Sequence, residues 1–323
     1  MARSPQAELA VRVASSAQGV LDRSLARNLL ISIRPGQWTK NLIVFAALIF
    51  GRRLTDPTAV GLACAAFFVF CGLGGTVYLI NDVIDREQDR RHPLKARRPI
   101  ASGALQPAAA LIAALVLGGA SVGVAFWIRP ALGAIAIAYV ALHMAYSGWL
   151  KHVVILDVLT IAIGFVLRAV GGGMAIAVPV SQWLLVCTIL LALFLALSKR
   201  RHELVLLADG ATNHRPILGE YSPYLLDQMI GVVTASTLVA YVFYAISPET
   251  AQRFGTPLLG LTIPLPLYGI FRYLYLVHRK EKGGSPAELL LNDRPLLVCV
   301  ALWAVAVILI VYHPFGSWPG PRL

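Results

Sequence analysis

The sequence predicts an all-α integral membrane protein with nine transmembrane helices. Of its 323 residues, 58% are hydrophobic and only 14% are charged, and the mean hydropathy is +0.71. An average soluble domain carries about a quarter charged residues. Apolar runs of the roughly 17–25 residues that a span needs recur along the chain. Lys and Arg also gather in alternate connecting segments, which is typical of a membrane protein with a fixed orientation.

The nine expected spans differ in how clearly they are marked. The first holds only about a dozen uninterrupted apolar residues, fewer than a regular span needs. The fifth contains Asp157 and Arg168, which lie three helical turns apart and therefore share one face. Both charges need partners or a polar cavity, and Gly171-Gly172-Gly173 then permits close helix contact or a break. The spans cover residues 38–54, 58–80, 106–128, 131–149, 152–175, 181–198, 228–247, 256–277 and 295–313.

The distribution of positive charge sets the expected orientation. With the N-terminus inside, 22 of the 28 Lys and Arg residues lie in cytoplasmic segments. The net charge of +12 is then explained by the orientation of the protein in the membrane and by contact with anionic lipids. This distribution of charge argues against a nucleic-acid partner. We therefore expect a multi-pass protein of the cell (inner or plasma) membrane, with the C-terminus outside. A cytoplasmic tail (1–30), without the apolar run of a cleaved signal peptide, would precede one transmembrane domain (31–323).

Cysteine usage indicates no disulfide framework. The four cysteines lie in apolar runs without the spacing of metal ligands, as expected of small core residues. They are Cys64, Cys71, Cys187 and Cys299.

An acidic segment, residues 81–89, follows the second apolar run. On a helix, Asp82, Asp85 and Asp89 are three and four residues apart, so their carboxylates share one face. Such carboxylates repel one another, and Mg²⁺, which proteins hold with a few carboxylates plus substrate phosphates, relieves the repulsion. The alternative is a solvated helix end balanced by neighbouring arginines. Clustered acids at the mouth of a membrane helix are costly, which favours the metal site.

Cationic groups near this segment and after the sixth span suit phosphate oxygens. Lys95, Arg97 and Arg98 follow the acids directly. Residues 199–203, Lys-Arg-Arg-His-Glu, form a second charged helix end in which the first and last side chains are one turn apart. Lys40 leads into the first span. These residues also have a plainer interpretation as positive-inside flanks.

The acidic segment carries a resemblance to a known family. Asn81-Asp82-x-x-Asp85-x-x-x-Asp89, followed by Arg97-Arg98-Pro99-Ile100 and Gly103, resembles the first signature of the UbiA superfamily of membrane prenyltransferases, over roughly residues 30–313. The resemblance implies nine transmembrane helices around a central cavity and Mg²⁺ bridging the aspartates to a pyrophosphate. It also implies a second aspartate-rich motif after the sixth helix, where this chain has Lys199 to Glu203.

That departure resembles one branch of the superfamily, the decaprenyl-phosphate phosphoribosyltransferases. Two further patterns support the resemblance, Arg34-Pro35-x-Gln37-Trp38-x-Lys40-Asn41 and Asp89-Arg90-x-His92-Pro93-x-Lys95. The implied reaction transfers 5-phosphoribose from phosphoribosyl pyrophosphate to a polyprenyl (decaprenyl) phosphate at the cytoplasmic face, a step toward cell-wall arabinan.

The resemblance implies the following site. The catalytic set would be Asp82, Asp85 and Asp89, holding Mg²⁺, together with Lys199. The residues expected to bind the two phosphorylated substrates are Lys40, Asn81, Lys95, Arg97, Arg98, Tyr146, Lys151, Arg168, Arg200 and Glu203. A conventional prenyltransferase joining a prenyl pyrophosphate to an aromatic acceptor, and a transporter with the acids as an ion site, are the alternatives. The acceptor's chain length, the number of metal ions and the oligomeric state stay open.

Overall fold

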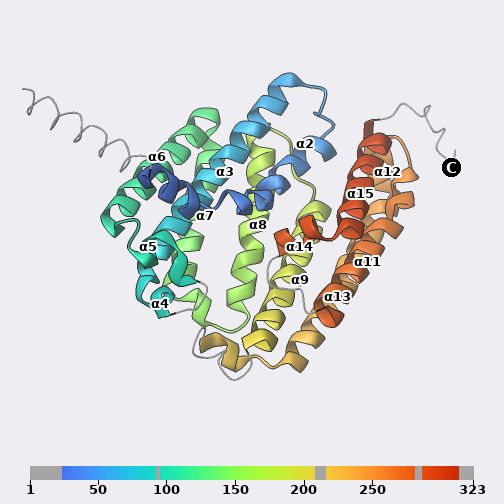
Figure 1. Ribbon diagram of the computed structural model, residues 1–323. Coiled ribbons are helices and arrows are strands. Elements are labelled where there is room, and N and C mark those ends of the chain that lie inside the picture. The colour runs from blue at the N-terminus through green and yellow to red at the C-terminus, as the bar shows by residue number, and fades with distance from the viewer. Residues whose placement is uncertain (1–23, 92–94, 208–215, 281–285, 313–323) are drawn as a thin grey trace, which may run out of the picture. The chain divides into compact units, whose positions relative to one another are not determined.

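The computed structural model describes residues 24–91, 95–207, 216–280 and 286–312. Within these ranges every regular element is an α-helix or a 3-10 helix (Figure 1), which confirms the all-α fold class. His92 and Pro93 of the signature lie outside the described residues, as does most of the expected N-terminal tail.

Eight spans in the described part of the chain are long and apolar enough to cross a membrane. They coincide with the second to ninth expected spans, so the chain is a multi-pass membrane protein. They are α3 (Pro57–Ile84), α6 (Pro107–Ile128), α7 (Pro130–Gly148), α8 (Leu156–Ala175), α9 (Gln182–Leu207), α11 (Pro223–Ile246), η6 (Leu258–Thr262) continued by α13 (Pro264–Arg279), and α15 (Arg294–Tyr312).

The first expected span, residues 38–54, is not a helix of this length. It consists of a 3-10 helix, η1 (Pro35–Phe45), followed by the short α2 (Ala46–Phe50). A count of nine spans is therefore not confirmed, and the sides on which the termini lie stay predictions. A 3-10 helix of eleven residues is unusually long, since such runs seldom exceed about four residues, so tertiary contacts must hold it.

Glycines of α8 provide those contacts. A Cβ added to Gly172 would lie 2.1 Å from the carbonyl oxygen of Val44 in η1, whereas one added to Gly171 would lie 2.5 Å from the ring of Phe70 in α3. The backbone of η1 thus lies directly against α8, one turn beyond Arg168, which bonds to Asn41 of η1. This confirms the prediction that the three glycines permit close contact.

Gly172→Ala is expected to lower the free energy of unfolding by about 1–3 kcal/mol, because the new methyl group meets backbone that must move. The measurement is thermal or denaturant unfolding of the purified protein. Gly119→Ala in α6 is the matched control: a Cβ there meets no heavy atom within 4 Å, so the change should stabilise by about 0.5–1 kcal/mol. Equal effects at the two positions would contradict the packing argument.

The chain divides into two compact units, residues 1–38 with 71–122, and residues 39–70 with 123–323. The first contains the helix of residues 24–32, the second half of α3, α4 (Arg86–Arg91), η2 (Lys95–Arg97), α5 (Pro99–Ser102) and most of α6. Leu79, Ile100 and Leu105 form its apolar core. Gly103, in the left-handed region at φ 85°, ends α5, which a residue with a Cβ does less readily.

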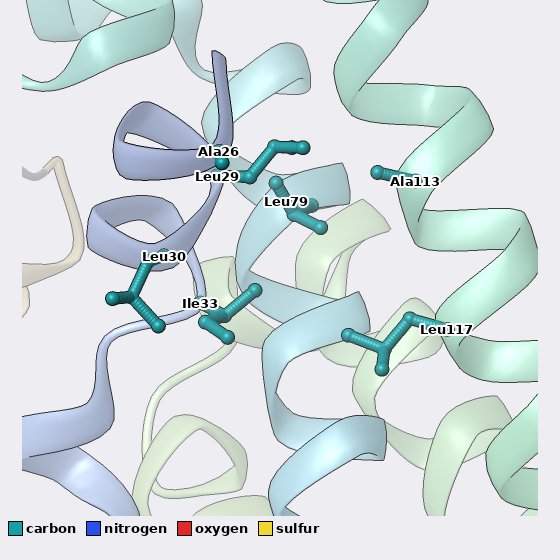
Figure 2. Close-up of a pocket in the computed structure, with 7 residues that line it drawn as sticks. All are labelled: Ala26, Leu29, Leu30, Ile33, Leu79, Ala113 and Leu117. Atoms are coloured by element: carbon teal, nitrogen blue, oxygen red, sulfur yellow. The ribbon is translucent and has the colours of Figure 1, made fainter. Parts of the chain in front are cut away.

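The helix of residues 24–32 leaves an apolar groove of about 310 Å³ beside α3 and α6 (Figure 2). Every side chain in the groove is aliphatic, so it offers no group that could recognise a phosphate. It is lined by Ala26, Leu29, Leu30, Ile33, Leu79, Ala113 and Leu117.

In the second unit, the long helices contact one another in chain order: α7 packs on α8, α8 on α9, and α9 on α11. At the end of the chain, α15 contacts both α13 and α2. Tyr312 of α15 donates its hydroxyl to the carbonyl oxygens of Leu48 and Ile49 and accepts from the amide of Leu54. Besides α2 and η6, the short helices described in this unit are η3 (Leu150–His152), η5 (Pro216–Glu220), α12 (Pro248–Phe254) and α14 (Pro286–Asn292).

The four cysteines are free thiols, and Cys71 and Cys299 are buried. For these two this agrees with the expectation of small core residues, whereas Cys64 and Cys187 are only partly buried.

Candidate functional site

Two of the three predicted carboxylates meet on one cation in the first unit. Nη1 of Arg98 donates to Oδ1 of Asp82 at 3.0 Å and to Oδ2 of Asp89 at 2.6 Å. Both aspartates are buried, with side chains 3% and 4% exposed. Asp82 and Asp89 therefore share one face, as their spacing predicts.

Asp85 lies where the helix is interrupted. α3 ends at Ile84 and α4 begins at Arg86, yet the amides of Asp85 and Asp89 still donate to the carbonyls four residues earlier, those of Asn81 and Asp85. The interruption is thus slight, and the half-exposed Asp85 side chain stays on the same segment as its two neighbours.

Arg34 is a second cation at Asp82 that the sequence prediction omitted from the site. Its Nη2 donates to Oδ1 of Asp82 at 2.5 Å, and its guanidinium lies 4.5 Å from the centre of the Tyr78 ring. Arg34 has a φ of 53°, a left-handed conformation that costs a residue with a Cβ about 1–2 kcal/mol. The only sequence signal was its place in the Arg34-Pro35 pattern.

The remaining predicted cations of this unit differ in exposure. Nζ of Lys95 lies 4.0 Å from Oδ1 of Asp89, whereas Arg97 is exposed in η2. Arg98 is the N-cap residue of α5, followed by Pro99 at the first helical position. Its backbone is therefore fixed while its guanidinium, 28% exposed, reaches the acids.

The residue types fit Mg²⁺. Carboxylate oxygens are the ligands that Mg²⁺ prefers, and here two of them converge on a single cationic nitrogen. Among the described residues, no group of three or more His, Cys, Asp or Glu side chains is close enough to hold a metal ion, and Asp82 and Asp89 are paired with arginines instead. That pairing is the arrangement expected from the alternative interpretation, so the role of Asp82, Asp85 and Asp89 as metal ligands stays a prediction.

In the second unit, a buried network surrounds Arg200, whose side chain is 2% exposed. Its Nε donates to Oδ2 of the fully buried Asp157 at 2.8 Å, and its Nη1 donates to Oε2 of Glu203 at 2.7 Å. Nη2 lies 3.4 Å from the hydroxyl of Tyr146. The guanidinium predicted to bind substrate is thus occupied within the protein.

Tyr221 completes this network and carried no sequence signal. Its hydroxyl donates to Oδ1 of Asp157 at 2.8 Å and accepts from the amide of Ile155 at 2.8 Å. Burial raises the pKa of Tyr221 to about 12, so the hydroxyl keeps its proton at neutral pH. Ile155 has a φ of 70°, an outlier for a β-branched residue, and the bond to Tyr221 holds it there.

Tyr221→Phe is expected to lower the free energy of unfolding by about 1–3 kcal/mol, because the buried Asp157 loses a donor. Tyr224→Phe is the control, since that side chain is 72% exposed and should change stability by less than about 0.5 kcal/mol. Unfolding curves of the two variants give the comparison, and a neutral Tyr221→Phe would remove Tyr221 from the network.

Lys199 and Glu203 form the accessible end of the network. Nζ of Lys199 lies 3.7 Å from Oε1 of Glu203, and the side chains are 41% and 26% exposed. They share a face, as the spacing predicts. Tyr146, in the last turn of α7, and Lys151, in η3, are half-exposed at the adjoining loop.

Arg168 binds neutral groups rather than Asp157. Its Nε donates to Oδ1 of Asn41 at 2.8 Å, its Nη2 donates to the hydroxyl of Tyr139 at 2.5 Å, and it lies over the rings of Tyr139 and Phe165. This confirms the expectation that each charge of the fifth span finds partners on other elements. Lys40, next to Asn41, is half-buried in η1.

The Asp82 cluster and the Lys199 end thus lie in different units. That they face a common pair of substrates stays a prediction.

The chain is similar to several known proteins. The family model described as "UbiA prenyltransferase family" matches residues 42–292. A decaprenyl-phosphate phosphoribosyltransferase of Corynebacterium glutamicum is 32% identical over 300 residues, which cover 90% of this chain and 88% of that protein. One from Mycolicibacterium smegmatis is 32% identical over 291 residues, covering 87% and 91%. A UbiA homolog from Archaeoglobus fulgidus, solved with GPP and Mg²⁺, has the same fold, with a TM-score of 0.69 at 17% identity, covering 88% of this chain and 99% of that one.

Proposed function

The chain belongs to the UbiA prenyltransferase family, and from this family and from the relatives named above we infer that it is a membrane-bound transferase that acts on a polyprenyl phosphate. We propose that it transfers 5-phosphoribose from phosphoribosyl pyrophosphate to decaprenyl phosphate. The similarity over about nine-tenths of the chain to proteins named decaprenyl-phosphate phosphoribosyltransferase supports the acceptor and the transferred group. The observation in this chain that carries the proposal is the ion-paired Lys199–Glu203 helix end, where the resemblance led us to expect a second acidic motif.

The reaction exchanges one bond at ribose C1. A phosphate oxygen of the lipid bonds to C1 while the bond from C1 to pyrophosphate breaks, and pyrophosphate leaves with the electron pair. The lipid phosphate is already an anion, so it needs no strong general base. Positioning and charge neutralisation are what the protein must supply.

In the first unit, Asp82, Asp85 and Asp89 would hold Mg²⁺, which, when bound, neutralises charge on the leaving pyrophosphate. Arg98 already contacts two of these carboxylates and so stands beside the point where the pyrophosphate would lie. Lys95 and the exposed Arg97 would bind the remaining phosphate oxygens of the donor, and Asn81 would contact it from α3.

In the second unit, Lys199 would screen the repulsion between the two anionic substrates, with Tyr146 and Lys151 at the lipid phosphate. Arg200 holds Glu203 in place, which leaves Glu203 to orient Lys199 and to accept from the ribose hydroxyls. Lys40 would bind donor phosphate beside the Arg168–Asn41 bond. The positive-inside pattern supports an active site at the cytoplasmic face of the cell membrane.

The test is incubation of membranes containing the protein with Mg²⁺, labelled phosphoribosyl pyrophosphate and decaprenyl phosphate. A labelled lipid should form without any aromatic acceptor, and a chelator should abolish it. A labelled product only from a prenyl pyrophosphate and an aromatic acceptor would instead establish the conventional prenyltransferase. Flux across sealed liposomes without either product would indicate a transporter.

Lys199→Asp is expected to lower kcat/KM at least about 100-fold and Lys199→Ala only about 10-fold, because a reversed charge adds repulsion where a cation screened it. The same labelled-lipid assay measures both. In the single variant, the new carboxylate at position 199 repels that of Glu203. The double variant Lys199→Asp/Glu203→Gln removes this repulsion. It should stay as impaired as Lys199→Asp, and recovery would mean that Lys199 acts only on Glu203.

A further inference from the structure

A groove of about 790 Å³ runs between α11 and α13, apart from the candidate site. One face of each helix lines it, since Ile230, Thr234 and Leu238 recur every four residues in α11, and Phe271, Leu274 and His278 every three or four in α13. Gly231 and Ala235 also line it and contribute almost no side-chain volume, which leaves the groove hollow.

The groove is open to lipid and has the length of one leaflet. Both helices are membrane spans, and Phe271 and Tyr275 of the lining are 55% and 43% exposed. The lining of α11 begins at Asp227 and ends at Leu238, a rise of about 17 Å along the helix. Half of a hydrocarbon core about 30 Å thick is about 15 Å. A lipid chain of a single leaflet therefore matches it.

One end of the groove is charged. Asp227 accepts hydrogen bonds from Nε and Nη2 of Arg201 and from Nε2 of His278, the last at 3.1 Å. Nδ1 of His278 lies 3.0 Å from the carbonyl oxygen of Leu274. Both ring nitrogens of His278 thus face oxygen atoms of the protein.

Arg279, the last residue of α13, is exposed at the same end. Arg201 neutralises Asp227, so Arg279 leaves this end net positive. Basic pockets between transmembrane helices on the cytoplasmic side recognise anionic lipid headgroups, and the last turn of α13 lies on the side that the positive-inside pattern assigns to the cytoplasm.

We propose that this groove binds an anionic phospholipid, with an acyl chain along the apolar walls and the phosphate at Arg279. The occupant is a lipid of the surrounding bilayer, because the groove spans one leaflet and its charged end complements a phosphodiester. The site is independent of the proposed transfer reaction, whose candidate residues do not line it.

The first test compares retention of phosphatidylglycerol and phosphatidylcholine by the purified protein, counted by native mass spectrometry. The wild type should retain phosphatidylglycerol several-fold more than phosphatidylcholine, and Arg279→Gln should remove that preference. Arg129→Gln, which removes an equal charge from an exposed residue outside the groove, should keep it. Equal retention of both lipids by the wild type, or an unchanged preference in Arg279→Gln, would overturn the proposal.

The second test fills the groove. A Cβ at Gly231 meets no heavy atom within 4 Å, so Gly231→Leu should fold and displace the lipid whatever its headgroup. Gly123→Leu in α6, where a Cβ also meets nothing within 4 Å, is the control and should retain the lipid. If Gly231→Leu keeps its lipid, the groove is not a lipid site. If Gly231→Leu changes only the oligomeric state, the groove is again not a lipid site, and this face is instead a contact between two copies of the chain.

Discussion

Asp85→Ala is expected to lower Mg²⁺-dependent turnover at least about 100-fold while the protein stays folded. A ligand of a catalytic metal is worth this much because the metal neutralises the leaving group. Asp85 is preferred as the target because Asp82 and Asp89 are both ion-paired with Arg98, and removing either of them would alter that pairing. Asp85 is half-exposed at the interruption between α3 and α4, whereas Asp82 and Asp89 are buried, so its removal should disturb packing less than theirs.

Glu87→Ala is the matched control for this prediction. Glu87 lies two residues further on, its side chain is 68% exposed, and it pairs with Arg90 at 3.0 Å. An exposed pair of this kind contributes at most about 1 kcal/mol, so turnover should stay near the wild-type rate. If Asp85→Ala and Glu87→Ala are equally active across a Mg²⁺ titration, the carboxylates are a neutralised helix end and not a metal site.

Arg200→Ala is expected to lower the free energy of unfolding by about 3–5 kcal/mol, because it leaves Asp157 buried without its cation. The neighbouring Arg201 pairs with Asp227, and those side chains are 17% and 38% exposed. Arg201→Ala should therefore cost no more than about 1 kcal/mol. Unfolding of the two variants in the same detergent makes the comparison.

Kinetics separate this structural role from substrate binding. If Arg200 contacts substrate, as the sequence suggested, Arg200→Ala would leave stability close to that of Arg201→Ala and raise KM. If Arg200 is an internal cation, Arg200→Lys, which keeps the charge but not the planar set of donors, should recover only part of the stability.

Most of the fold followed from hydropathy, because apolar runs from the second to the ninth span are long and almost uninterrupted. The first span is not confirmed: its residues form a 3-10 helix and a short α-helix, and Val44 packs on Gly172, far along the chain. Hydropathy reports the environment of a segment. It does not report which backbone form packing imposes on it.

Two sequence signals predicted residues of the candidate site: the spacing of side chains along a helix and the energetic cost of a charge in an apolar run. Spacing placed Asp82 and Asp89 on one face, and the cost of a charge in an apolar run marked Asp157 and Arg168 as needing partners. Neither signal applied to Tyr221, since a tyrosine in a loop is ordinary. Its bonds to Asp157 and Ile155 depend on how a distant segment folds back, which spacing along one helix cannot give.

The hydroxyl of Tyr312 also bears on biogenesis. It donates to the carbonyl oxygens of Leu48 and Ile49 in α2, which lie 264 and 263 positions earlier in the chain. At about 5–20 residues per second, a ribosome needs roughly 15–50 s to make the residues between them. During that interval the two carbonyls have local donors, the amides of Arg53 and Arg52, so α2 can form early and is joined to the last helix only when synthesis ends.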